Sequence, residues 1–228
     1  MARYMYVLWR PYEAPLASFR AELLGTRAPA LADQVSHLVV SVADQKAPKM
    51  GDKRPEDRAR VSAVVEFEAA SDDHAKALGV LLDEGGTLSA GYCVEHAVVR
   101  DYTREWTDGT PSPGAVQMTF LRRKPGLDDD AFVDHWFNTH TPLALSIHPI
   151  WRYNRNKVLH AITDGAPDFD GLVGLHFRAL DDITNPMRLF GGKMENMQVI
   201  TEDVSSFIDM PAIVVNVMTE HILKSAQP

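Results

Sequence analysis

The sequence predicts an α+β fold in which two ferredoxin-like halves place their antiparallel sheets against each other. Three observations lead to this prediction: the chain repeats itself, each half has the element order βαββαβ, and this order leaves one face of the sheet without helices. A second sheet in the same chain can cover that face. The halves are expected at residues 1–104 and 112–228, joined by a linker rich in Gly, Pro and Ser.

An internal repeat is visible when the sequence is shifted by 113 positions. FRAELLGTRAPAL at 19–31 then lies over FVDHWFNTHTPLA at 132–144. At shifts of 110 and 125 positions, VVEFEAASD lies over GLHFRALDD, and VEHAVV lies over TEHILK. Few residues are identical, but the matched segments keep their order and each change of shift falls in a loop. This pattern indicates a duplication.

Six elements are expected in the first half. Its strand segments are rich in Val, Tyr and Phe, which favour extended chain. In chain order the elements are a strand at 4–10, a helix at about 16–28, strands at 36–42 and 61–69, a helix at about 73–82, and a strand at 92–99.

The second half repeats this order. Within LVGLHF, the residues Val173, Leu175 and Phe177 alternate with Gly174 and His176, which is typical of a strand with one apolar face. In chain order the elements are a strand at 115–123, a helix at 128–140, strands at 150–159 and 172–180, a less regular helical stretch between 182 and 210, and a strand at 212–221.

The composition excludes several classes of function. The net charge of −8 and the pI of about 5.5 argue against a nucleic-acid partner. No run of 18 apolar residues could span a membrane, and the first residues lack the apolar core of a signal peptide. Cys93 is the only cysteine, which fits a reducing compartment. We therefore expect a cytoplasmic protein without a nucleic-acid or membrane partner, and a homodimer is left open.

The helix expected at 128–140 carries a histidine on its apolar side. The spacing places five side chains on one helical face: Phe132, Trp136, His140, Leu143 and Ile147. Because Pro142 disfavours a helical conformation for the residue before it, His140 is expected to end the helix. A helix end raises the pKa of an imidazole and burial lowers it, so this group could titrate near neutrality and serve as a general acid or base. The alternative is a histidine that only caps the helix.

The second half resembles the EthD family of dimeric α+β barrel proteins. The shared pattern is an aromatic residue and a Lys-Pro-Gly turn at a strand end, then Phe, a His-Trp pair, and a His two residues before Pro. The matching residues are Phe120, Lys124, Pro125, Gly126, Phe132, His135, Trp136, His140, Pro142, Tyr153 and Asn156, with TEDVSSFID and Glu220-His221 further on. The resemblance covers about residues 115–223, whereas the first half has Arg27 where the second has His140. It favours a functional role for His140.

Further site residues are expected on the strands. His176 should point into the space between the sheets, where Glu66 is its counterpart in the first half. Tyr153 and either Asn154 or Asn156 could donate hydrogen bonds to a substrate oxygen, although RYNRN could also be a plain polar edge strand. Trp136 and Phe120 complete the expected lining of the substrate site. The predicted catalytic residues are His140, Tyr153 and His176, and the predicted binding residues are Trp136, Phe120, Asn154, Asn156 and Glu66.

The sequence predicts neither a metal nor a cofactor. His135 and His140 are five residues apart, which on an α-helix puts them on different faces, and no Cys-x-x-Cys occurs. A metal could be held only by residues far apart in the sequence. There is also no Gly-rich phosphate loop or nucleophile elbow, so nucleotide and flavin chemistry are not expected.

These observations favour a cofactor-independent enzyme that acts on a small apolar or aromatic molecule in the barrel cavity. What the resemblance implies is His-mediated proton transfer, and a lyase step, elimination or decarboxylation, is the specific hypothesis. Two alternatives stay open. One is a non-catalytic ligand-binding or accessory protein of an aromatic or ether degradation pathway, and the other is a cofactor-free monooxygenase.

Overall fold

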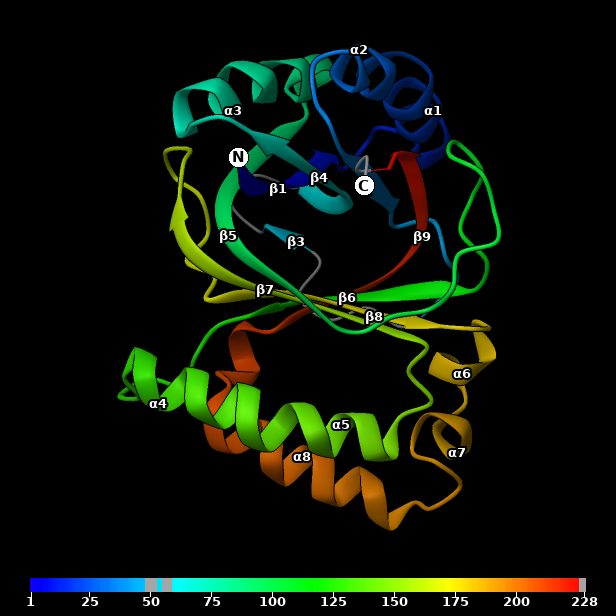
Figure 1. Ribbon diagram of the computed structural model, residues 1–228, viewed down its shortest axis with the longest axis vertical. Coiled ribbons are helices and arrows are strands. Elements are labelled where there is room, and N and C mark those ends of the chain that lie inside the picture. The colour runs from blue at the N-terminus through cyan, green and yellow to red at the C-terminus, as the bar shows by residue number, and fades with distance from the viewer. Residues whose placement is uncertain (48–52, 55–58, 226–228) are drawn as a thin grey trace.

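The computed structural model describes residues 1–47, 53–54 and 59–225 (Figure 1). The first half contains β1 (Ala2–Pro11), α1 (Leu16–Glu22), η1 (Leu23–Arg27), α2 (Ala28–Ala32), β2 (Leu38–Val42), β3 (Lys53–Arg54), β4 (Ala59–Ala69), α3 (Asp72–Gly79), η2 (Val80–Leu82), η3 (Glu84–Gly86) and β5 (Leu88–Arg100). The second half contains β6 (Ala115–Leu121), α4 (Asp129–Asp134), η4 (His135–His140), α5 (Thr141–Ile147), β7 (Arg152–Ala161), β8 (Gly171–Phe177), α6 (Asp181–Thr184), α7 (Pro186–Leu189), α8 (Glu195–Phe207), η5 (Met210–Ala212) and β9 (Val214–Lys224).

The strands form one closed antiparallel barrel, and this confirms the predicted fold. The order is β1-β5-β7-β8-β6-β9-β2-β4, with β4 pairing back to β1 and the short β3 added beside β4. Each half contributes four neighbouring strands in the order of a ferredoxin-like sheet. The halves are hydrogen-bonded to each other at two seams, β5 with β7 and β2 with β9. Closure leaves none of these eight strands with an unpaired edge.

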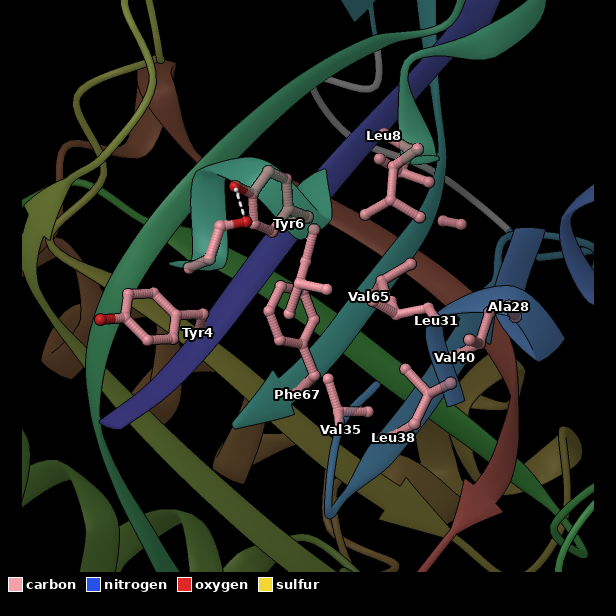
Figure 2. Packing of buried hydrophobic residues seen from close by; sticks show 14 of the residues in the cluster. Tyr4, Tyr6, Leu8, Ala28, Leu31, Val35, Leu38, Val40, Val65 and Phe67 are labelled. Atoms are coloured by element: carbon pink, nitrogen blue, oxygen red, sulfur yellow. Dashed lines mark hydrogen bonds between the residues drawn. The ribbon is translucent and has the colours of Figure 1, made fainter. Parts of the chain in front are cut away.

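Helices cover the outside of the barrel on two opposite sides (Figure 1). The helices α1 to α3 pack on the sheet of the first half, and α4, α5 and α8 pack on that of the second. Figure 2 shows the first of these layers, where Tyr6 and Phe67 stack at 5.6 Å and the Tyr6 hydroxyl donates to the Ala75 carbonyl. A third apolar cluster, which includes Met5, Met118 and Phe120, fills part of the barrel interior. Buried side chains therefore form two helix–sheet layers and one interior core.

The helix that carries His140 does not end there, and this corrects the expectation from the sequence. Thr141 has helical torsion angles, and its N–H bonds to the carbonyl of Trp136, five residues back, so η4 is a π-helical turn that continues into α5. The extra residue moves the buried face, so Thr141 and Ala144 are buried in place of the predicted Leu143 and Ile147. The π-turn already interrupts the regular hydrogen bonding of the α-helix, so Pro142, which has no N–H to donate, is tolerated at this position.

The first half has the same irregularity at the matching place. Its helix contains the π-turn η1 at Leu23–Arg27, followed by Pro29 in α2. A π-turn is rare in proteins, so two of them at equivalent positions support the duplication inferred from the sequence.

The linker lies along the barrel and does not separate the halves. Backbone bonds join Gly109 to Ile222 and Ser112 to Glu220, both on β9. No helix in the described part of the chain is long and apolar enough to cross a membrane.

We expect cleavage within residues 103–114 to leave the two halves associated, because antiparallel strand pairing joins them at both seams. Limited proteolysis followed by size-exclusion chromatography would test this, with denaturing electrophoresis to confirm the cut. Two monomeric folded halves eluting separately would show that each half is an independent domain.

Candidate functional site

A cavity of about 140 Å³ lies between the sheet of the second half and the helices that cover it. Its volume is close to that of engineered apolar cavities of about 150 Å³ that accept benzene. Most of its lining is apolar, and the polar side chains in it are Gln117, Thr119, His140, His148 and Tyr153. The apolar lining residues are Leu121, Trp136, Ala144, Val173, Leu175, Ile200, Val204, Phe207, Ile208, Ile213 and Val215.

His140 is held in this cavity by a carboxylate from α8. Its Nδ1 lies 2.6 Å from Oδ2 of Asp203, and its ring packs against Phe207 with centroids 5.2 Å apart. Nδ1 must carry the proton in this bond, because the carboxylate can only accept. The neutral ring therefore has its lone pair on Nε2, the nitrogen that is free to meet a ligand.

The same carboxylate also holds His135. Nε2 of His135 lies 2.8 Å from Oδ1 of Asp203, whose side chain is only 8% exposed. The sequence placed His135 and His140 on different helical faces. This is wrong because the π-turn has more residues per turn than an α-helix, so two residues five apart come to the same side. The two imidazoles and Asp203 form one hydrogen-bonded cluster between η4 and α8.

Burial is the largest influence on the imidazole of His140, and it lowers its pKa below the ordinary value. The hydrogen bond and charge of Asp203 act in the opposite direction, and His135 adds a small lowering effect. The balance keeps His140 neutral at pH 7 while Asp203 stabilises the cation that forms when the ring accepts a proton. These are the properties of a general base.

Trp136 and Tyr153 form the wall beside His140. The indole N–H of Trp136 donates to the Tyr153 hydroxyl at 3.3 Å, and Thr141 Oγ1 lies 3.5 Å from the same oxygen. Both aromatic side chains are at most 1% exposed. Burial raises the pKa of Tyr153, so its hydroxyl keeps its proton and can donate a hydrogen bond to a ligand.

A second imidazole reaches the cavity from the end of α5. His148 donates from Nδ1 to the Leu189 carbonyl at 2.8 Å, which leaves the lone pair of its neutral form on Nε2. Burial lowers its pKa, and the nearby His140 lowers it further. The cavity therefore contains two neutral imidazoles, and among the described residues only His140 of the two has a carboxylate partner.

The structure divides the predicted site into two groups. His140, Tyr153 and Trp136 line the helix–sheet cavity, as described above. The predicted partner His176 instead faces the barrel interior, together with Asn154, Asn156, Glu66 and Phe120. Adjacent strand residues point to opposite sides of the sheet, so Tyr153 and Asn154 cannot serve one cavity. The expectation that His140 and His176 act together in the barrel is wrong for this reason.

Glu66 and His176 do not bond to each other in the barrel interior. Glu66 bonds to Arg3 and His37, whereas the carboxylate nearest to His176 is Glu220, with Nε2 and Oε2 3.5 Å apart. Asn154 lies 3.4 Å from Nε2 of His176.

Two more of the predicted residues lie inside the barrel. Asn156 bonds to His96 and to the Leu172 carbonyl, and Phe120 packs on Phe169 in the apolar core. A separate cavity of about 430 Å³ is lined by side chains that include Glu66 and Asn154.

The first half has no histidine at the place of His140. Arg27 occupies it, with a side chain that is 2% exposed and paired with Glu22 at 2.7 Å. Arg27 also donates to the Leu82 carbonyl and to Thr87.

We expect Arg27→Ala to lower the free energy of unfolding by roughly 2–3 kcal/mol, because it removes a buried hydrogen-bonding group and leaves its acceptors unpaired. Urea unfolding would measure this loss. Ligand binding and turnover per folded molecule should be unchanged, and a loss of either without a loss of stability would place a functional site in the first half.

Sequence reasoning missed two residues of the cavity. Asp203 belongs to the TEDVSSFID segment that matched the EthD pattern, but nothing local showed that its carboxylate reaches His140. His148 follows α5 and was not considered as a site residue. Only the packing of α8 and of the segment around Leu189 against α5 places these contacts.

Comparison with known proteins agrees with the fold. The EthD domain model matches residues 124–211, and this confirms the resemblance for most of the second half. No curated protein sequence matches the chain at a significant level.

Solved structures with the same fold span nearly the whole chain. An anthrone oxidase-like protein is 10% identical, with a TM-score of 0.57, covering 99% of this chain and 95% of its own. A protein from Fusobacterium nucleatum with a provisional monooxygenase description is 14% identical, with a TM-score of 0.51, covering 98% and 93%. A chlorite dismutase variant from Candidatus Nitrospira defluvii, solved with cyanide, is 11% identical, with a TM-score of 0.51, covering 97% and 91%. At these identities the similarity shows the fold alone.

Proposed function

We propose that the chain is an enzyme that transfers protons on a small aromatic or apolar molecule bound in the helix–sheet cavity, with His140 as the acid/base group. The observation that carries this proposal is the 2.6 Å bond between Asp203 and Nδ1 of His140 at the wall of an otherwise apolar cavity. The bond occupies Nδ1 and leaves Nε2 of a residue that lines the cavity available to act on a ligand.

The reaction that this geometry supports best is a lyase step. Nε2 of His140 takes a proton from a carbon next to a carbonyl group, and the electron pair moves onto the carbonyl oxygen. Tyr153, which stays protonated, donates a hydrogen bond to that oxygen. The enolate then expels a leaving group from the neighbouring carbon, and His140 returns its proton to the departing oxygen. Side chains of the cavity move every proton in these reaction steps.

A β-hydroxy ketone tests both stages in one experiment. With 4-hydroxy-4-phenyl-2-butanone in D₂O, NMR would report deuterium entering the carbon next to the carbonyl, and absorbance would report the conjugated ketone formed by loss of water. Exchange without elimination would support the proton transfer but not the lyase step. Ligand binding with neither reaction, across a series of aryl ketones, would favour the ligand-carrier alternative.

The provisional monooxygenase and anthrone oxidase-like descriptions of similar structures favour a second candidate, cofactor-free oxygenation. The same base would deprotonate an electron-rich one-ring phenol, whose anion would then react with O₂. Consumption of O₂ with a one-ring phenol such as hydroquinone as probe, lost when His140 is replaced, would identify this reaction. Product formation that proceeds at the same rate without O₂ would identify the lyase.

We expect prolonged chelation to leave turnover at this cavity unchanged, because each proton-transfer step uses only side chains. Dialysis against EDTA followed by the D₂O exchange assay is the measurement. Loss of exchange that is restored by adding one particular metal would contradict the proposed mechanism.

A further inference from the structure

Three side chains of the kinds that bind metals converge at the seam between β5 and β7. One ligand atom each from Asp72, Cys93 and His160 lies within 4.8 Å of the other two. Asp72 is in the first turn of α3, and Cys93 and His160 are cross-strand neighbours. The sequence left open a metal held by residues distant along the chain, and only the tertiary structure brings these three together.

The contacts around the group are those that orient metal ligands. Nε2 of His160 lies 2.8 Å from one oxygen of Asp72. The other oxygen accepts a 2.8 Å hydrogen bond from the hydroxyl of Tyr4, which is 1% exposed. A carboxylate that is fixed by a buried donor is typical of metal sites, because such partners hold the ligand in its binding orientation.

We propose that Asp72, Cys93 and His160 form a zinc site. Zinc takes sulfur, nitrogen and oxygen ligands in tetrahedral geometry, and three protein ligands leave the fourth position for water. Hard cations such as Mg²⁺ and Ca²⁺ do not select a thiolate. Bond lengths of about 2.0–2.3 Å put tetrahedral ligand atoms roughly 3.3–3.8 Å apart, so shifts of about 1 Å would complete the site.

The site is accessible to an ion from solvent. The side chains of Asp72 and His160 are 42% and 51% exposed, while Cys93 forms the buried floor at 5%. A bound ion would replace the proton between Nε2 of His160 and Asp72, and the thiol proton of Cys93 would pass to solvent as the thiolate binds. The ion would then connect α3 and β5 of the first half to β7 of the second. We therefore expect zinc to clamp this seam of the barrel.

This site goes beyond the proposed enzymatic function and is separate from the cavity of His140. Tyr153 and His160 lie on the same strand, and seven residues of extended chain span about 23 Å. A metal at the seam therefore has no direct access to the reacting atoms, and the two proposals succeed or fail independently.

The test is a cobalt titration of the full chain after removal of metals, followed by competition with zinc. We expect one Co²⁺ per chain with a thiolate-to-cobalt charge-transfer band, which reports Cys93 directly, and displacement of cobalt by zinc. Cys93→Ser should abolish the band, and His160→Gln should weaken binding at least 10-fold. Zinc should raise the Tm of the parent protein but not that of His160→Gln.

A control variant and a second readout keep the test decisive. His140→Asn should bind cobalt like the parent, which excludes the His135–Asp203–His140 cluster as the site. If Cys93→Ser does not fold, His160→Gln still decides, because its side chain is half exposed and its loss leaves the core intact. Cobalt binding without a thiolate band, binding unaffected by His160→Gln, or no binding at all would overturn the proposal.

Discussion

His140→Ala is expected to reduce the rate of deuterium exchange into a bound aryl ketone by about 10²–10⁴-fold, the usual effect of losing a general acid or base. The ligand should still bind, because most of the cavity lining is apolar and does not change. His140→Asn is the matched variant, since its amide can donate to Asp203 as Nδ1 does but has no base at the position of Nε2. Both variants should be equally inactive, and the Tm of His140→Asn should be closer to that of the parent than the Tm of His140→Ala is.

The pH dependence of the parent provides a second readout. Because burial holds the pKa of His140 below its ordinary value of about 6.5, the base form persists into mildly acidic solution. The exchange rate should be level near pH 7 and should fall only as the pH drops through a value below 6.5. If folded His140→Asn protein exchanged deuterium at the parental rate, His140 could not be the base. The proposed mechanism would then be wrong, and the ligand-binding alternative would be favoured.

Asp203→Asn is expected to have the second largest effect, a loss of roughly 10²–10⁴-fold in exchange rate, as seen when the orienting carboxylate of an Asp-His pair becomes an amide. The two imidazoles each donate to one carboxylate oxygen. An amide has only one oxygen, so one imidazole must meet an N–H group and take the opposite tautomer. If that ring is His140, its proton moves to Nε2 and the base is lost.

Two measurements distinguish loss of the orientation of His140 from a general loss of structure. Because Asp203 raises the pKa of His140, Asp203→Asn should move the acidic limb of the remaining activity to lower pH. His135→Gln, which removes the competing imidazole, should cost much less activity than Asp203→Asn. Equal losses of activity in the two variants, with an unshifted pH profile, would indicate that Asp203 only stabilises the packing of α8 on η4.

Much of the fold could be predicted from the sequence because it depends on local and repeated patterns. The alternation of Val173, Leu175 and Phe177 with Gly174 and His176 placed His176 correctly on the barrel interior. The repeat predicted two equivalent halves, and the matching π-turns support this. The buried face of the helix was predicted wrongly after residue 140. The π-turn adds one residue to a turn, and the spacing of apolar residues in the sequence does not reveal this.

The sequence by itself determined which residue types were available: a histidine on the apolar side of a helix, a tyrosine on a facing strand, and two halves able to close a barrel. Only the tertiary structure decided which of them share a space. Tyr153 and Asn154 point to opposite sides of the sheet and so line different cavities. The packing of α8 brings Asp203 to His140. The closure of the β5–β7 seam brings Cys93 to His160. A site of this kind is a set of long-range contacts, and its geometry is fixed by how elements pack on each other, whereas periodicity reports only on each element alone.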